Sequence, residues 1–292
     1  MSQTTDPKTT GPDVSHSSGE ASGAKTSAEP RRAGLPSPPG RRIPIATWIT
    51  LGIGAAFLWA ALGLEVSASD LFGLPSKLFN QLQAFFPPDA EYGQTKVLPA
   101  ALESLQIAWI GTIIGAFLSL PLAFLAARNL APRTGVIFKT FLAAVRTMPE
   151  ILLAIYFVPI VGLGAFAGAL AVGIHSIGTV GKLSSEVIES MDTRPLEAIR
   201  AAGGGRLAEL RYGVLPQVLP EILALWLYRF EINLRASAVL GVVGAGGLGG
   251  VLLNTLRYRR FEEAGAVLVV TIVAVLLVDM ISGAIRRRLT ES

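Results

Sequence analysis

The sequence contains no cysteine, two histidines and few charged residues. Without cysteine the chain can form no disulfide bond, thiolate zinc site or cysteine nucleophile. Charged residues make up 16% of the chain, which is low for a soluble domain of 292 residues, whereas hydrophobic residues make up 51%. Glycine, with 31 residues, is as frequent as in packed membrane helices. This composition indicates an integral membrane protein.

A nucleotide-binding signature is also missing. The Walker pattern needs a glycine loop that ends in Gly-Lys followed by Ser or Thr. The glycine clusters at 203–205 and 244–249 lack that lysine and hydroxyl, and no βαβ pattern surrounds the second cluster. The sequence also shows no metal-ligand cluster and no catalytic triad. We therefore expect no catalytic residue, no metal and no ATP site in this chain, and a membrane enzyme is the least favoured class.

The first 40 residues differ from the rest of the chain. They are rich in Ser, Thr, Pro and Gly and contain almost no large apolar side chain. Such a segment cannot bury enough apolar surface to offset its conformational entropy, so we expect residues 1–40 to be disordered. Residues 41–289 are predicted to form a single all-α membrane domain with about six transmembrane helices.

Six apolar segments are candidate membrane spans, each needing roughly 20 mostly apolar residues. They lie at about 43–64, 100–127, 140–161, 164–181, 220–243 and 264–285. Between the first two spans, the sequence predicts an amphipathic interfacial helix that starts at about Pro75 and stops before Pro87 and Pro88.

Lysine and arginine residues near the span ends predict the orientation. In a six-span arrangement, most of them fall on one side, at 31–42, 128–139, 182–211 and 286–288. That side is predicted to be cytoplasmic, with both termini on it, so the net charge of +4 indicates membrane orientation and not a nucleic-acid partner. The cluster Arg257, Arg259 and Arg260 falls on the opposite side. It either attracts an anion to the outer mouth of a pathway or belongs to a solvated loop.

The polar segment at about 184–216, between the fourth and fifth spans, predicts two short helices joined by a sharp turn. Pro195 suits the first turn of the first helix, and the second helix is expected over 206–212. The small-residue face of the first helix and the glycine break after it are formed by Ala198, Ala201, Gly203 and Gly204. A surface of this kind can lie in the groove of a partner protein.

This segment resembles the cytoplasmic signature of importer permeases of the ATP-binding-cassette class. The signature reads Glu-Ala-Ala, three residues, Gly, nine residues, Ile, one residue, Leu-Pro. The matching positions are Glu197, Ala198, Gly203, Leu215 and Pro216. Ile199 replaces the second alanine, and Gly213 replaces the isoleucine. The resemblance implies that the segment couples the chain to a separate ATPase subunit.

The resemblance narrows to the phosphonate-importer permeases and covers about residues 43–289. It rests on the segments 146–150, 211–220, 229–241 and 244–249. It implies a homodimer in the lipid of the cytoplasmic (inner) membrane, with two ATPase subunits that bind ATP and Mg. It further implies an extracytoplasmic substrate-binding protein that delivers an oxyanion, either phosphonate or the related phosphite or phosphate.

The fifth span carries polar residues well inside it, where a charge is costly unless it is paired or hydrated. They are Arg229, Glu231, Asn233, Arg235 and Ser237. Glu231 and Arg235 lie four apart on one helix face, where they could pair directly. Arg229 lacks an acid on its own face, so its partner must come from another helix, another subunit or the substrate; a guanidinium suits phosphorus oxyanions. These residues either line the translocation path or form a buried structural network.

Arg146 and Glu150 lie four apart, with Pro149 between them. We expect them to pair on a kinked helix, and all three are candidate gate residues. His175, in the fourth span, is expected to be a hydrogen-bonded packing residue.

The glycine-rich segment 241–250 is expected to be a flexible connector, or else a re-entrant turn whose amides face an oxyanion. Asp279 is expected to meet Arg286 or Arg287 near the end of the sixth span. Two other functions stay open from the sequence. One is a permease of the same class for another small solute, because pocket residues diverge on one fold. The other is a secondary transporter or channel, which would need no coupling segment.

Overall fold

The computed structural model describes residues 44–63 and 68–290. The chain divides into two units, residues 1–66 and 67–292. In the first unit, α1 (Ile45–Gly63) is an apolar helix of 19 residues with no buried residue, as expected of a span covered by lipid. The segment predicted to be disordered, 1–40, lies outside the described residues.

The second unit is built from helices, with no strand among its described residues. In chain order they are α2 (Ala68–Ala84), α3 (Ala90–Tyr92), η1 (Gly93–Val97), α4 (Leu98–Ala126), α5 (Gly135–Thr147), α6 (Glu150–Val161), α7 (Ala165–Ser190), α8 (Arg194–Ala201), α9 (Arg206–Ala208), η2 (Glu209–Val214), α10 (Leu215–Leu240), η3 (Gly241–Val243), α11 (Gly247–Arg257) and α12 (Phe261–Thr290). In the described part of the chain, 4 helices are long and apolar enough to cross a membrane, or up to 6 spans if each bent pair counts as one. The predicted all-α membrane fold is confirmed.

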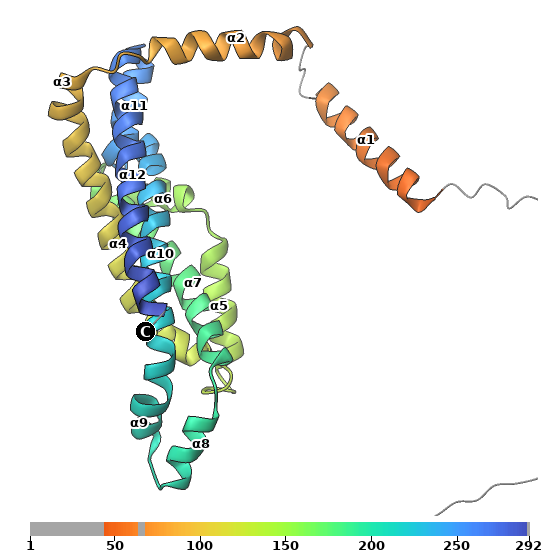
Figure 1. Cartoon of the computed structure of the whole chain (residues 1–292), viewed down its shortest axis with the longest axis vertical. Helices are drawn as coiled ribbons and strands as arrows, with labels where there is room; N and C mark the ends of the chain where they lie inside the picture. Colours follow the sequence, from red (N-terminus) through yellow and green to blue (C-terminus); the bar gives the residue numbers. More distant parts are fainter. Residues whose placement is uncertain (1–43, 64–67, 291–292) are drawn as a thin grey trace, which may run out of the picture. The chain divides into compact units, whose positions relative to one another are not determined.

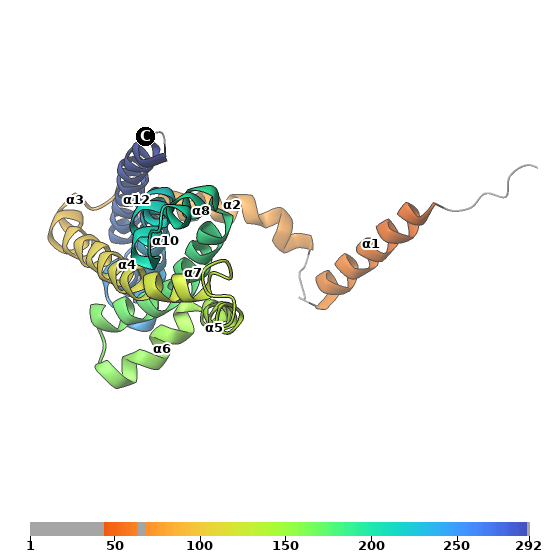
Figure 2. The same cartoon turned by 90° about the horizontal axis from the view of Figure 1, so that it is seen from below.

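Helices α4 and α7 pack closely because small residues let their backbones approach. A Cβ added to Gly115 would lie 2.4 Å from Cβ of Ser176, and one added to Gly111 would lie 2.8 Å from Cγ1 of Val172. Seen from below, α7 lies between α4 and α10 on one side and α5 on the other (Figure 2). The two glycines therefore serve helix packing.

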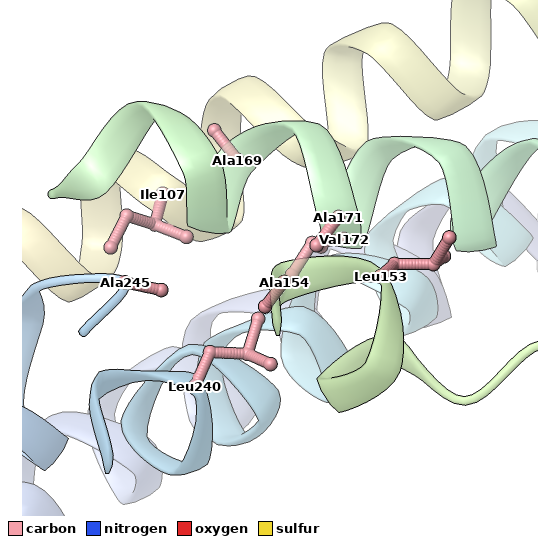
Figure 3. Packing of buried hydrophobic residues seen from close by; sticks show 8 residues of the cluster. All are labelled: Ile107, Leu153, Ala154, Ala169, Ala171, Val172, Leu240 and Ala245. Carbon is pink, nitrogen blue, oxygen red and sulfur yellow. The ribbon is translucent and has the colours of Figure 1, made fainter. Parts of the chain in front are cut away.

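A buried apolar cluster joins α4, α6, α7 and α10 (Figure 3). Its members are Ile107, Leu153, Ala154, Ala169, Ala171, Val172, Leu240 and Ala245. Ala245, which is 0% exposed, brings the glycine-rich segment into this core. The expectation of a flexible connector there is wrong, because the segment packs among the helices.

The third predicted span is two helices, α5 and α6, that meet at 81°. The sequence predicts a kink at Pro149, but the helix is broken completely. Met148 is extended at φ −77° and ψ 118°, and Pro149 is the N-cap residue of α6. A proline ring disfavours helical geometry in the residue before it, which explains where α5 ends.

The interfacial helix α2 starts earlier than predicted. Pro75 lies inside it, because its fixed φ is close to the helical value and only one backbone hydrogen bond is lost. The helix ends at Ala84, before Pro87, as predicted.

The polar segment is shorter than predicted. Helix α7 continues to Ser190, so residues 184–190 are its last turns. At the other end, α9 and η2 lead directly into α10, and Pro216 lies in the first turn of α10. A proline at that position costs little because the first amides of a helix have no partner within the helix.

Candidate coupling segment and translocation path

Residues 194–214, here called the coupling segment, comprise α8, a glycine turn, α9 and η2. The segment projects beyond the other helices at one end of the second unit (Figure 1). Thr193 is the N-cap residue of α8, and proline lies in its first turn. Gly203 follows the helix with φ +80°, the left-handed conformation in which glycine commonly ends a helix. The two short helices joined by a sharp turn, which the sequence predicts, are therefore present.

Side-chain contacts hold the two arms of the coupling segment together. Arg200 donates from Nε and Nη2 to the two carboxylate oxygens of Glu209, at 2.9 and 2.8 Å. These hydrogen bonds lower the pKa of Glu209 and raise the pKa of Arg200. Leu196 is buried beside Gly213, where a Cβ would lie 3.0 Å from its Cδ1. Glycine in place of the isoleucine of the signature therefore leaves room for Leu196.

The surface of the coupling segment is partly apolar. Leu207 is 78% exposed and Tyr212 is 67% exposed. The signature and turn residues that are also exposed are Glu197, Ala198, Ala201, Gly203 and Pro216, whereas Gly204 and Leu215 are half-buried. The coupling segment therefore leaves apolar side chains available for contact with another protein.

Arg229 lies in a buried hydrogen-bond network that joins α10 to α4, α6 and α7. Its Nη2 donates to Glu150 Oε1 at the start of α6, and its Nε donates to Ser176 Oγ at 2.9 Å. Asn233 donates from Nδ2 to Thr112 Oγ1 at 2.8 Å and to Ser176 Oγ at 3.1 Å. Arg229 is 5% exposed and Asn233 is 0% exposed. The prediction that Arg229 takes its partner from outside its own helix face is confirmed.

Glu231 and Arg235 face α12 instead of forming an ion pair with each other. Glu231 Oε1 lies 3.5 Å from Arg286 Nη2, and Arg235 Nη2 lies 3.5 Å from Asp279 Oδ1. The predicted Glu231–Arg235 pair is wrong because α12 packs along α10 and supplies both partners. Since Arg286 follows the sixth predicted span, Glu231 lies near the depth where that span ends.

Two residues complete the predicted polar stripe of α10. Ser237 is buried and donates to the carbonyl oxygen of Leu234 in its own helix, at 2.7 Å. Arg235 has a side chain that is 53% exposed. The polar residues of α10 are therefore divided between a face toward α7 and a face toward α12, and on the second face Glu231 is buried whereas Arg235 is partly exposed.

The candidate gate residues lie at the break between α5 and α6. Arg146 is in the last turn of α5 and forms no ion pair with Glu150, because the bend separates the two helices. Glu150 instead contacts Arg229 and lies 3.5 Å from His175 Nε2. His175 Nδ1 lies 2.9 Å from the carbonyl oxygen of Met148 and donates to it, since a carbonyl can only accept. The predicted Arg146–Glu150 pair is wrong, whereas His175 is hydrogen-bonded as expected and its packing role stays a prediction.

The glycine-rich segment 241–250 is hydrogen-bonded to α4. Gly247 N donates to Glu103 Oε2 at 3.0 Å, and Leu248 N donates to Ser104 Oγ at 2.9 Å. These two amides already have partners on α4, so neither of them is available to an oxyanion. Sequence reasoning missed Glu103, although an acid within the second predicted span is the kind of residue that marks a functional or structural contact.

These polar residues offer charge and hydrogen bonds, not metal ligation. Within the described residues, no group of three or more His, Asp or Glu side chains could hold a metal ion. The Arg229–Glu150 contact fixes the start of α6 against α10. Any movement of α6 relative to α10 therefore has to break or carry along a buried ion pair.

Residues 119–291 match the protein family described as binding-protein-dependent transport system inner membrane component. This chain belongs to that family. The matched residues include the whole coupling segment, the break between α5 and α6, and all of α10. The chain is thus a multi-pass component of the inner membrane.

Several curated relatives are similar over much of the chain. The phosphite transport system permease protein PtxC of Stutzerimonas stutzeri is 41% identical, over 82% of this chain and 86% of the relative. The phosphate-import permease protein PhnE of Mycolicibacterium smegmatis is 40% identical, over 70% of this chain but 38% of that relative. A protein described as a cryptic phosphonate transport system permease, PhnE2 of Escherichia coli, is 45% identical over 40% of this chain and 97% of the relative.

Solved structures share the fold. A chain of an amino acid ABC transporter with histidines has a TM-score of 0.55 and 21% identity, over 68% of this chain and 94% of its own. A chain of the MetNI methionine ABC transporter, in an inward-facing conformation, has a TM-score of 0.56 and 22% identity, over 64% of this chain and 93% of its own. At this identity the likeness concerns the fold alone.

Proposed function

We propose that this chain is the permease subunit of an ATP-binding-cassette importer that moves a phosphorus oxyanion (phosphonate, phosphite or phosphate) across the inner membrane. The observation that carries the proposal is the exposed coupling segment at one end of a bundle of membrane helices. An ATPase that binds this segment would transmit its movement to the membrane helices joined to the segment. A secondary transporter would have no use for such a segment.

The substrate class is supported by the more similar relatives, whose names refer to phosphite, phosphate and phosphonate at 40–45% identity. Members of the family at lower identity are named for other solutes. The spermidine/putrescine transport system permease protein PotC of Haemophilus influenzae, for example, is 26% identical. A phosphorus oxyanion is therefore the first substrate to test, and a cationic solute is the informative control.

The assembly follows from the same proposal. Two copies of the permease form a homodimer, and each coupling segment binds one ATPase subunit on the cytoplasmic side. The ATPase subunits hold ATP and Mg, and the permease only transmits their movement. An extracytoplasmic substrate-binding protein delivers the oxyanion at the opposite end. Both chain termini are then cytoplasmic.

The path and the gate are assigned to the polar residues around α10. We place the translocation path along this helix, with Arg229, Glu231, Asn233, Arg235 and Ser237 as its candidate residues. The break at Pro149 allows α6 to move separately from α5, and the Glu150–Arg229 contact holds it in place. Arg146 lies at the other side of that break. The competing role for these residues is a structural network that holds the helices together.

The turn of the coupling segment allows a matched test. Valine at position 203 would have to adopt φ +80°, which a β-branched residue resists, whereas Gly205 is extended at φ −82° and accepts valine without strain. Neither glycine has a neighbour within 4 Å of an added Cβ, so a clash at Cβ distinguishes neither variant and the difference in φ is the main contrast. We expect Gly203→Val to lose the co-purifying ATPase in mild detergent and Gly205→Val to keep it. Recovery of no ATPase with the unaltered chain would contradict the proposal.

The substrate is tested with the assembled complex in liposomes. We expect ATP-dependent uptake of phosphite, phosphate or methylphosphonate when the binding protein is present, and none of spermidine. If the complex with bound ATPase takes up spermidine and no phosphorus oxyanion, the proposal that the chain is an importer permease stands, and the proposed substrate class is refuted.

A further inference from the structure

A pocket of about 620 Å³ opens beside the glycine-rich segment. Its polar lining comes from Tyr92, Lys96, Asn254, Arg257 and Arg260. These residues belong to α3, η1, α11 and the turn before α12, which lie at the end of the second unit opposite the coupling segment (Figure 1). The proposed path, the Arg229 network and the coupling segment do not include any of them.

The lining of this pocket is positively charged. Lys96, Arg257 and Arg260 line it, and no Asp or Glu does. Within the described residues, the side chains of Lys96 and Arg257 make no hydrogen bond or ion pair, whereas Arg260 lies 3.4 Å from Glu263 and over the ring of Tyr258. At least two cations therefore face the pocket with their binding capacity unused.

Glycine backbone forms part of the pocket's wall, beside the apolar side chains of Val242, Val251 and Leu253. Gly241, Gly244 and Gly250 contribute to it. A Cβ on Gly241 would lie 2.4 Å from the backbone nitrogen of Gly250, so glycine is required where η3 and α11 meet. This arrangement brings the pocket to the outer end of α10, along which the path is proposed to run.

The position of these cations is unusual for a membrane protein. Lysine and arginine normally gather at the cytoplasmic ends of the spans, which in the proposed orientation is the end of the coupling segment. A cationic cluster at the opposite end needs a reason other than orientation. Guanidinium groups bind phosphorus oxyanions through paired hydrogen bonds, and a positively charged recess raises the local concentration of anions.

We propose that this pocket is an outer anion site, where the phosphorus oxyanion binds on delivery, before it enters the path along α10. The inference rests on the proposed function for the identity of the anion. Arg257 is the principal contact, and the supporting contacts are Asn254, one turn earlier in α11, and Lys96 from η1.

Direct binding tests the site without transport. The probe is inorganic phosphate, observed by ³¹P NMR line broadening on the permease–ATPase complex in nanodiscs, without binding protein. We expect Arg257→Gln to weaken phosphate binding about fivefold, as for loss of one partly exposed charge contact. Arg259→Gln is the matched control, because Arg259 is exposed and adjacent but does not line this pocket. Equal binding by both variants and the unaltered complex would overturn the proposal.

A second measurement separates the pocket from a docking surface. If Arg257→Gln leaves phosphate binding unchanged and weakens association of the unloaded binding protein, the pocket receives an acidic protein surface and the anion site is refuted. If the unaltered complex binds phosphate through Arg257 but transports no phosphorus oxyanion, the site stands and the proposed function fails. Loss of phosphate binding together with slower uptake is the result expected.

Discussion

The Arg229–Glu150 contact is the clearest case in which one residue pair holds separate helices. The two residues lie 79 positions apart, and the side chain of Arg229 is only 6% exposed. Removing one partner of a buried ion pair leaves the other charge without compensation, at a cost of about 3–5 kcal/mol. We therefore expect Arg229→Ala to lower the thermal unfolding temperature of the detergent-purified permease markedly.

Two control variants test whether the loss of stability comes from the buried ion pair. Arg235→Ala removes a charge from the same helix, but its side chain is 53% exposed and its contact with Asp279 is 3.5 Å, so the expected cost is below about 1 kcal/mol. Arg229→Ala combined with Glu150→Ala removes both charges and should recover part of the stability. Equal effects of Arg229→Ala and Arg235→Ala would show that the buried network contributes little.

For single residues, the sequence shows that a buried charge requires a partner more reliably than it shows which residue the partner is. It shows that Arg229 has no acid on its own helix face, so a partner outside that face follows. It cannot name Glu150, because contacts between distant segments depend on how the helices pack. The mistaken Glu231–Arg235 pair has the same origin: spacing within a helix says nothing about Arg286 and Asp279 on the neighbouring one.

Among the elements, α5 and α7 approach closely at Gly178. A Cβ on Gly178 would lie 2.5 Å from the backbone nitrogen of Arg146, which cannot move without moving α5. Gly283, in α12, has no neighbour within 4 Å of an added Cβ. We expect Gly178→Ala to destabilise the protein by about 1–3 kcal/mol through overpacking, and Gly283→Ala to leave the unfolding temperature within error. A stable Gly178→Ala variant would mean that α5 is loosely packed.

The coupling segment should respond to pH through Glu209. Hydrogen bonds from Arg200 lower its pKa below the ordinary value of 4.5. A carboxyl group with a lowered pKa stabilises the folded form above its ordinary pKa, and that contribution is lost as the pH falls toward the folded value. We expect amide hydrogen exchange of residues 194–214, corrected for intrinsic rates, to increase as the pH falls below 4.5.

Two substitutions check the cause of that pH response. Glu209→Gln should exchange faster at neutral pH and lose most of the pH dependence. Asp192→Asn should not, because the carboxylate of Asp192 contacts only Arg194, two residues away, and the backbone hydrogen bonds of Asp192 to Gln217 are kept. An unchanged pH response in Glu209→Gln would assign it to another group.

Element boundaries follow from local signals where a proline or glycine sets them. Gly203 marks the end of α8, as the sequence predicts, and Pro149 marks the place where the predicted kink is a complete break. The 81° bend after α5 has no local signal, because its direction is set by the packing of α6 against α7 and α10. Ser190 ends α7 well beyond the predicted span, since the hydropathy of a segment marks the lipid boundary and not the end of the helix.

For the whole molecule, the sequence predicts the fold class and the coupling segment but not the arrangement of the helices. Apolar residues can cover every face of a helix in lipid, so periodicity does not show which face packs. Small residues give a partial signal, as Gly111 and Gly115 do for α4 and α7. The network of Thr112, Ser176 and Asn233 was not predictable as a unit, because it needs three helices in place.

The absence of cysteine makes the orientation of the molecule measurable with single introduced cysteines. Leu207, in the coupling segment, is 78% exposed, and Arg259, beside the outer pocket, is also exposed. Because α10 and α11 lie between them, the two positions should face opposite sides of the membrane. We expect a membrane-impermeant maleimide to label Arg259→Cys in intact spheroplasts and Leu207→Cys only after the membrane is opened. Ile53→Cys, in the middle of α1, is the lipid-covered control. Labelling of Arg259→Cys only in opened membranes would place the cationic pocket in the cytoplasm, where it could not receive an imported anion, and would refute both the outer anion site and the predicted orientation.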